Sequence, residues 1–321
     1  MRESHSWTRT AISKIPGVLR IIDLRLRPTR FAVGLLCALL GVPAFATCPP
    51  AGHDKPTLQA LKTAKFSVAD IGAKRALATG LLECLADPDP ELRDGIAFEA
   101  LSQWMRAGDF DAVALRDLRD RLYMLLDGPE GEGYGRPFAA LVLSEVARTD
   151  RIQTWMSAQE RGAMVDKAAS YLESVRDYRG YDEKQGWRHG VAHGADWLMQ
   201  LALNPALDRA QADRLLAAVA VQAVPPSAHA YVFGEPERLA RPVLFIAQRG
   251  LLTEAEWSTW LAALPASLGD ADRAYRDAGW LARRHDLMAF LGSLYLETDN
   301  SQDARIRSLQ PLVLQAIKGV P

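Results

Sequence analysis

The chain has 321 residues, of which 49% are hydrophobic and 24% charged, a composition typical of an ordinary globular protein. Its 38 lysines and arginines are nearly balanced by 39 acidic residues, which gives a net charge of −1. No arginine-rich run follows the first 46 residues, so the sequence argues against nucleic acid as a partner.

The first 46 residues have the pattern of a secretory signal peptide. Arginines between positions 20 and 30 precede an apolar run over residues 31–42, and Ala44 and Ala46 then form an Ala-x-Ala cleavage site. This apolar run is too short for a permanent membrane span, which needs about 20 residues. We therefore predict cleavage near Ala46 and a periplasmic or secreted protein.

A lipid anchor at Cys48 is the alternative to a soluble mature protein. Bacterial lipidation prefers a small residue just before the cysteine and an aliphatic residue three positions before it, whereas this chain has Thr47 and Phe45 there. These residues favour the soluble form. Cleavage removes seven basic and two acidic residues, so the net charge of residues 47–321 is −6, which mainly indicates solubility.

Two cysteines, Cys48 and Cys84, remain after cleavage. Because an exported protein folds in an oxidising compartment, we predict a disulfide that ties the mature N-terminus to the first long helix. The alternative is a free, buried Cys84 beside a mobile Cys48.

After a linker over residues 47–56 that contains proline and glycine, apolar residues recur with helical spacing to the end of the chain. Ser157 and Thr253 begin capping boxes, and Asp208 stands at another helix start. We find no convincing alternation of apolar and polar residues, so the predicted class is all-α, with residues 57–321 in a single domain. The expected helices cover residues 57–65, 68–86, 90–107, 111–126, 137–148, 158–175, 184–203, 208–222, 235–248, 253–264, 271–296 and 302–318.

Some of these helices form a weak internal repeat. Apolar helices centred near residues 98, 141, 191, 244 and 287 recur every 43 to 53 residues, and each begins close to an arginine. A pair of helices in about 40–47 residues is the period of HEAT and armadillo repeats. We therefore predict an α-α superhelix of HEAT/armadillo-like helix pairs, with a compact helical bundle as the alternative.

The segment 179–196 concentrates histidine, glycine and aromatic residues. If residues 184–203 form one helix, His189, His193 and Asp196 share a face, because they stand at positions i, i+4 and i+7. Two imidazoles one turn apart and a carboxylate can hold a divalent metal ion. The alternatives are a ligand pocket without metal and a polar network that only stabilises the helix.

A second segment, residues 231–239, carries similar residue types. Glu235 and Glu237 stand at the expected start of a helix, where the helix dipole favours carboxylates. Arg238 suits an ion pair or an anionic ligand, because a guanidinium binds carboxylates in a bidentate manner. Return of the chain through the helix at 208–222 would bring this segment beside the first one, so we predict that the two form one site.

The candidate ligand-binding residues of the two segments are arginines, acids, histidines and aromatic residues: Arg179, Tyr181, Trp187, His189, His193, Asp196, Tyr231, Glu235, Glu237 and Arg238. Each also has an ordinary interpretation, because charged residues at helix starts are usually solvated caps and aromatic residues at helical spacing usually belong to the core.

The pattern R-G-Y-x4-G-W-x-H-x2-A-H-x-A-D, with G-E-x-E-R-L-A about forty residues later, resembles a bacterial family known only as a domain of unknown function. The resemblance covers roughly residues 87–264, and these two motifs are its specific part. It implies an all-helical fold and supports the position of the site, but it implies no activity or cofactor. Many members look cytoplasmic, so an exported member departs from the family.

Two functions remain open. In the first, an exported binding module presents the two segments to an unknown protein, peptide or cell-envelope ligand. In the second, a metal-dependent hydrolase uses the His-x3-His-x2-Asp set to activate water, with Glu235 or Glu237 as acid or base. We favour binding, because α-solenoids mostly serve as binding platforms and no glutamate stands beside the first histidine as in H-E-x-x-H proteases.

Overall fold

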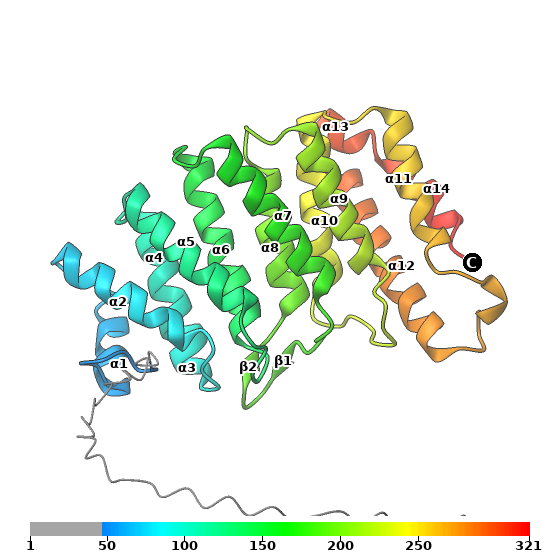
Figure 1. The fold of residues 1–321 in the computed structure, drawn as a ribbon. Helices are drawn as coiled ribbons and strands as arrows, with labels where there is room; N and C mark the ends of the chain where they lie inside the picture. Colours follow the sequence, from blue (N-terminus) through cyan, green and yellow to red (C-terminus); the bar gives the residue numbers. More distant parts are fainter. Residues whose placement is uncertain (1–46) are drawn as a thin grey trace, which may run out of the picture. The chain divides into compact units, whose positions relative to one another are not determined.

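The computed structural model describes residues 47–321 (Figure 1), and the predicted signal peptide over residues 1–46 lies outside the described residues. The described part is all-α, as predicted. None of its helices has the length and apolar composition that a bilayer crossing requires.

The helices follow the expected order, but two predictions near the C-terminus need correction. The helix predicted over 271–296 begins only at Ala278, and the one predicted over 302–318 is divided into α13 and α14, because Pro311 suits the first turn of a new helix and not a helix interior. A π-helical turn, η1, joins α3 to α4, and a short 3-10 helix, η2, precedes α12. The elements are α1 (Lys55–Thr63), α2 (Ile71–Cys84), α3 (Pro90–Leu92), η1 (Arg93–Phe98), α4 (Glu99–Ala107), α5 (Ala112–Asp127), α6 (Gly135–Ile152), α7 (Ala158–Ser174), α8 (Gly190–Ala202), α9 (Arg209–Ala223), α10 (Glu235–Arg249), α11 (Glu254–Ala266), η2 (Ala271–Arg273), α12 (Ala278–Asn300), α13 (Ala304–Arg307) and α14 (Gln310–Lys318).

The helix starts have the chemistry expected from the sequence. Ser157 and Thr253 form capping boxes at α7 and α11, and Asp208 forms a third at α9. In each box the cap side chain accepts a hydrogen bond from the third helical residue, whose own side chain accepts one from the cap backbone. These caps satisfy donors that the first helical turn would otherwise leave without partners.

Within residues 47–321 the helices alternate between two rows. Helices α4, α6, α8, α10 and α12 pack side by side in an inner row, and α5, α7 and α9 lie against it in an outer row (Figure 1). The core lies between the rows, where Leu172 of α7, Trp197 of α8 and Val219 of α9 are fully buried. Packing of each helix on the next but one is the pattern of stacked helix pairs. The HEAT/armadillo type of these pairs stays a prediction.

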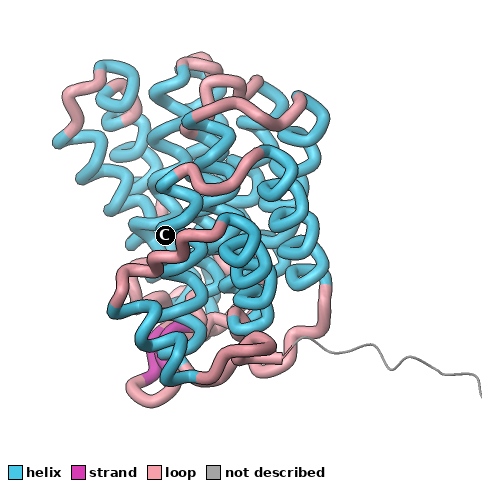
Figure 2. The backbone as a smooth tube through the Cα atoms, turned by 90° about the vertical axis from the view of Figure 1, so that its left-hand side faces the viewer, coloured by secondary structure: helices cyan, strands magenta, loops and turns pink. Residues whose placement is uncertain are grey.

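The helix predicted over residues 184–203 also begins later than expected. Residues 184–189 are not helical, because β1 (Tyr181–Asp182) and β2 (Gly186–Trp187) form an antiparallel hairpin before α8. The Asp182 carboxylate accepts hydrogen bonds from two backbone N–H groups of the turn, and Gly186 has a φ of 71°. These features favour a tight turn over a helix. The hairpin lies at the end of the helix rows where α8 begins (Figures 1 and 2).

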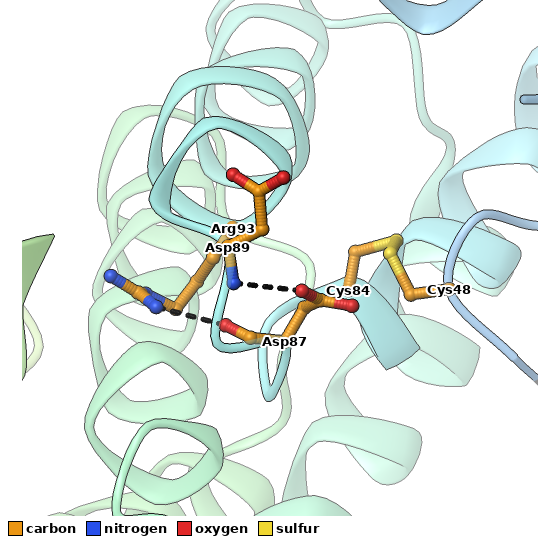
Figure 3. The surroundings of a disulfide bond; sticks show 5 residues. All are labelled: Cys48, Cys84, Asp87, Asp89 and Arg93. Atoms are coloured by element: carbon orange, nitrogen blue, oxygen red, sulfur yellow. Dashed lines mark hydrogen bonds between the residues drawn. A yellow bond between two sulfur atoms is a disulfide. The ribbon is translucent and has the colours of Figure 1, made fainter. Parts of the chain in front are cut away.

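The predicted disulfide between Cys48 and Cys84 is present and joins the first described residues to the end of α2 (Figure 3). Pro50 packs closely on this helix, because a Cβ atom at Gly80 would lie 2.8 Å from the proline ring. The next turn is held by Arg93, whose Nη1 donates to the carbonyl of Asp87 at 2.8 Å. The predicted linker 47–56 is therefore held against α2 by the disulfide at Cys48 and by the packing of Pro50.

Candidate functional site

The two segments predicted to form one site lie in contact. The ring of Phe233 packs directly on the backbone of Gly180, where an added Cβ atom would lie 2.0 Å from Cδ2 of the ring. Phe233 also meets the ring of Trp187 edge-on, with 6.0 Å between centroids. The prediction that the chain returns through α9 to bring these segments together is confirmed.

Two aromatic side chains of the hairpin form an exposed layer over the site. Tyr181 is 48% exposed and Trp187 37% exposed, and their ring centroids lie 5.1 Å apart. They stand opposite each other in the strand register, which places both side chains on the same face of the hairpin. Trp187 also stacks on the imidazole of His189 at 4.6 Å. An apolar surface that is open to solvent therefore covers a buried histidine.

His189 has an unusual backbone and an unusual side-chain environment. It precedes α8 with a φ of 56°, a left-handed conformation that few residues other than glycine adopt. Its Nε2 is buried without a hydrogen-bond partner among the described residues, and lies 3.7 Å from Oε1 of Glu235. Burial lowers the pKa of His189 to about 4, and nearby Arg238 acts in the same direction, so the ring is neutral at pH 7.

His193 lies one turn further, inside α8, and its tautomer follows from its contact. Its Nδ1 is 3.1 Å from the carbonyl oxygen of Pro137 in α6. A carbonyl only accepts hydrogen bonds, so Nδ1 of the neutral ring carries the proton and Nε2 keeps a free lone pair. Burial lowers the pKa of His193 to about 3, with neighbouring His189 as the second cause. The ring also meets Phe138 edge-on at 5.2 Å.

Glu235 is buried at the first position of α10 and faces His189. Its Oε2 accepts a hydrogen bond of 2.9 Å from the backbone N–H of Phe233. Burial raises the pKa of this carboxyl, and the backbone donors oppose the rise. Glu237, the other predicted acid, is exposed. The neutral imidazole and the carboxyl are therefore close enough to share a ligand but not to bond each other.

Asp196 pairs with arginines. Its carboxylate forms an ion pair with Arg238, and Arg241 lies 3.9 Å away on the next turn of α10. Burial raises the pKa of Asp196, and the two guanidinium groups oppose that rise. Among residues 47–321, no group of three or more histidine, cysteine or acidic side chains is arranged to hold a metal ion.

The predicted helix face of His189, His193 and Asp196 needs a correction. His189 lies before the first residue of α8, because the hairpin displaces the helix start from residue 184 to Gly190. The two imidazoles remain neighbours, with 5.7 Å between ring centroids. The carboxylate of Asp196, in contrast, pairs with Arg238 and Arg241 of α10 and not with the histidines.

Two predicted site residues have partners elsewhere. Arg179 is exposed and pairs with Asp177, not with an acid of the second segment. Tyr231 is buried, and its hydroxyl donates to the side chain of Gln222 at 3.0 Å. Its backbone N–H donates to Asp286 at 2.7 Å. These residues support the loops around the site rather than face its aromatic surface.

Phe233 and Arg241 belong to the site but were not among the predicted residues. Phe233 stands within the second motif, directly before Gly234. Its position next to this glycine is the one feature of the sequence that could have indicated a place in the site. Arg241 is one turn after Arg238 on α10, and helical spacing alone would have placed it on the same face.

A protein family described as protein of unknown function (DUF2785) matches residues 127–296, which include both segments of the site. Neither the curated proteins nor the solved structures contain a match to this chain.

Proposed function

The chain belongs to the family described as protein of unknown function (DUF2785), a description that names no activity, and from the site itself we propose an exported binding module. The observation that carries this proposal is the exposed pair Tyr181 and Trp187, which lies over the buried His189 and Glu235. Exposed aromatic rings with polar atoms beneath them are typical anchors of protein and peptide interfaces.

The buried polar atoms supply the specificity of this site. Nε2 of His189 is without a partner among the described residues, although an unsatisfied buried polar atom costs about 1–3 kcal/mol. A ligand that displaces Trp187 and donates or accepts a hydrogen bond there would recover that energy. A protein, a peptide or a cell-envelope ligand with an apolar group next to a polar one fits this arrangement.

Export is part of the proposal. It is supported by the signal-peptide pattern of residues 1–46 and by the disulfide between Cys48 and Cys84, since structural disulfides persist in oxidising compartments. If the protein is exported, its partner is expected in the periplasm or outside the cell.

The metal-dependent hydrolase has less support. A water-activating site of this kind needs three protein ligands that converge, and Asp196 already binds Arg238. Elemental analysis of untagged protein separates the two functions. A stoichiometric transition metal that is lost in His193→Ala, with the fold intact, would favour the hydrolase over the binding module.

Photo-crosslinking in the native host tests the binding site directly. A benzophenone side chain replaces Trp187, and a matched replacement of Val113, which is 75% exposed on α5, serves as the control. The binding module predicts a discrete adduct from position 187 that is absent from position 113. It also predicts that Tyr181→Ala weakens the adduct, because the two rings are neighbours.

The proposal fails if positions 187 and 113 give the same adducts, since this would mean that the aromatic surface makes only random contacts. It also fails if Tyr181→Ala leaves a position-187 adduct unchanged.

A further inference from the structure

The inner row of helices carries an arginine face that is separate from the aromatic surface. It consists of five arginines on α4, α6 and α10, with one acid on α6 and one on α8: Arg106, Arg148, Arg151, Arg238, Arg241, Glu145 and Asp196. The remainder of the mature chain is acidic, because the net charge of residues 47–321 is −6. The sign of the charge is therefore reversed on this face.

Both acids of the arginine face are already neutralised. Arg106 forms a bidentate ion pair with Glu145 between α4 and α6, and Arg238 pairs with Asp196 between α8 and α10. Two guanidinium groups, those of Arg148 and Arg151, form no ion pair with a described residue. Arg151 donates only to the neutral side chain of Gln200, whereas Arg241 shares Asp196 with Arg238, at a distance of 3.9 Å.

Arg148 is the second of these groups. It stands three residues before Arg151 on α6, so the two side chains are neighbours on the helix surface. Burial and then the charge of Arg148 lower the pKa of Arg151, and Glu145 opposes this. Because Arg106 already pairs with Glu145, a bound anion would reduce the repulsion between the two cations.

A partly apolar cavity adjoins the same face. It has a volume of about 460 Å³ and lies between α8, α10, α12 and α13. Its apolar wall consists of Met199, Leu244, Phe245 and Ile306, and its polar wall of Arg241, Glu297, Asn300 and Ser301. A ligand that fills it would place an apolar group beside a guanidinium.

We propose that the arginine face binds an acidic peptide segment whose apolar side chain enters the cavity beside Arg241. Neighbouring inner helices pack about 8–10 Å apart, and an extended peptide rises about 3.4 Å per residue. The arginines of α6 and α10 are separated by α8, so acidic residues about five to six positions apart would meet both helices. Gln200 lies on α8 between them, and because its Oε1 accepts from Arg151, its amide N–H groups can donate to the peptide backbone.

The apolar wall of this cavity distinguishes a peptide from other polyanions. Nucleic acids and acidic glycans would use the guanidinium groups, but they lack an aliphatic side chain for the wall of Met199, Leu244 and Phe245. This surface goes beyond the aromatic site, and its occupant does not depend on Tyr181 or Trp187.

Selection from a phage library of random 12-residue peptides on the purified chain tests this inference. The selected peptides are expected to be enriched in aspartate and glutamate and to share one apolar residue. Their affinity for the chain should fall as the salt concentration rises, because screening weakens contacts between exposed charges. Selection of peptides without an acidic enrichment would overturn the inference.

Charge reversal identifies the surface that binds these peptides. Arg148→Glu together with Arg241→Glu is expected to lower the affinity about tenfold or more, because like charges then face each other. Arg121→Glu on α5 is the matched control, since the side chains of Arg121 and Arg241 are both 46% exposed. Arg241→Gln, which removes the charge without adding another, keeps the test valid if the double variant does not fold.

Equal losses in the control and in the arginine-face variants would contradict the inference. Arginine-dependent binding of an oligonucleotide or of anionic vesicles, without selection of acidic peptides, would assign the face to another class of partner and also overturn it. The Trp187→Ala variant should retain the selected peptides. This result separates failure of the arginine face from failure of the aromatic site.

Discussion

His189 and His193 are buried next to each other in a region that also contains Arg238, and this environment keeps both rings neutral. Burial is the main cause, and it lowers the pKa of His189 to about 4 and that of His193 to about 3. A neutral imidazole is a hydrogen-bond acceptor at one nitrogen, so each ring offers one lone pair at pH 7. A ligand of the proposed binding module would therefore meet hydrogen-bond acceptors, and not positive charge, at these two rings.

The first prediction concerns pH. The two histidines have a pKa near 6.5 in the unfolded chain and of about 4 and 3 in the folded chain. Between these values the unfolded chain binds protons that the folded chain does not bind. The free energy of unfolding contributed by the two rings therefore falls as the pH falls from about 6.5 to about 4. Chemical denaturation at several pH values should show that His193→Gln loses less stability across this range than the wild type, by about 1 kcal/mol or more.

The comparison with a variant is needed because the acids of this region act in the opposite direction. Burial raises the pKa of Asp286 to about 6 and also raises that of Glu235, so their contribution to stability increases as the pH falls. These groups remain in both proteins, and the difference isolates the histidine. Parallel pH curves for the wild type and His193→Gln would show that this ring has the same pKa in the folded and unfolded chains, which would contradict the prediction.

The sequence indicated which types of residue form the site, but not which of them are in contact. The crowding of histidine, acid and aromatic residues in two segments correctly indicated that the segments meet. The means of contact, a phenyl ring on the bare backbone of Gly180, has no signature in residue spacing. The left-handed backbone of His189 was also hidden, because it depends on how the hairpin enters the helix.

Helices α8 and α10 are joined by a partly buried ion pair. Asp196 lies on α8 with its carboxylate largely buried, and Arg238 reaches it from α10. Removal of one partner from such a pair leaves a charge without compensation, which is worse than the absence of both.

A second prediction follows for Arg238→Leu. It should lower the free energy of unfolding by about 2 kcal/mol, less than for a fully buried pair because Arg241 partly compensates. Arg121→Leu breaks an exposed pair with Asp117 one turn away and should cost at most about 0.5 kcal/mol. Addition of Asp196→Asn to Arg238→Leu should recover part of the loss. Equal costs for the two arginines would mean that the pair does not stabilise the packing of α8 on α10.

The disulfide constrains the other end of the helix rows. Cys48 and Cys84 are separated by 36 residues, so their bond closes a loop that includes both α1 and α2. Cross-links across loops of this size stabilise proteins by about 3–4 kcal/mol, mainly because they restrict the unfolded chain.

A third prediction is that Cys84→Ala, or reduction with dithiothreitol, lowers the denaturant midpoint substantially, whereas dithiothreitol has no further effect on the variant. Urea denaturation with and without reductant measures both. An unchanged midpoint in the reduced wild type would show that α1 and α2 hold their places without the bond.

The helices could be predicted well because their signals are local. Capping residues such as Ser157 and Thr253 mark starts, and apolar spacing marks the buried face. The hairpin was missed because two-residue strands are too short to show alternation. The apolar spacing of α8 also continues backwards through Trp187, which extended the predicted helix over a turn set by Asp182 and Gly186.

At the scale of the whole molecule, the charge is unevenly distributed over residues 47–321. Residues 47–321 have a net charge of −6, and five of their 31 basic side chains lie on the arginine face. The all-α class and the family were predictable from the sequence, because both depend on patterns that span many residues. The surfaces were not, since each combines side chains from helices that lie far apart in the chain.

A fourth prediction concerns export. Expressed from its own start in a Gram-negative host, the chain should be recovered from the periplasm with an N-terminus near Thr47. N-terminal sequencing of the fractionated protein measures this. Recovery of the intact chain in the cytoplasm would contradict export, but it would leave the two binding surfaces as they are.

The central claim is that residues 179–196 and 231–239 form a single site, and a double-mutant cycle between Gly180 and Phe233 tests it most directly. Gly180→Ala should lower the free energy of unfolding by about 1–3 kcal/mol, because its methyl group would overlap the ring of Phe233. The same substitution at Gly292, which has open space in α12, should instead stabilise the chain by about 0.5–1 kcal/mol.

In a Phe233→Ala background the penalty of Gly180→Ala should disappear, because the ring that the methyl group strikes is gone. The measurement is urea denaturation of the wild type, the two single variants and the double variant. A coupling of about 1–3 kcal/mol is the predicted result. The same penalty for Gly180→Ala in both backgrounds would mean that the two segments do not meet, and that the site does not exist as described.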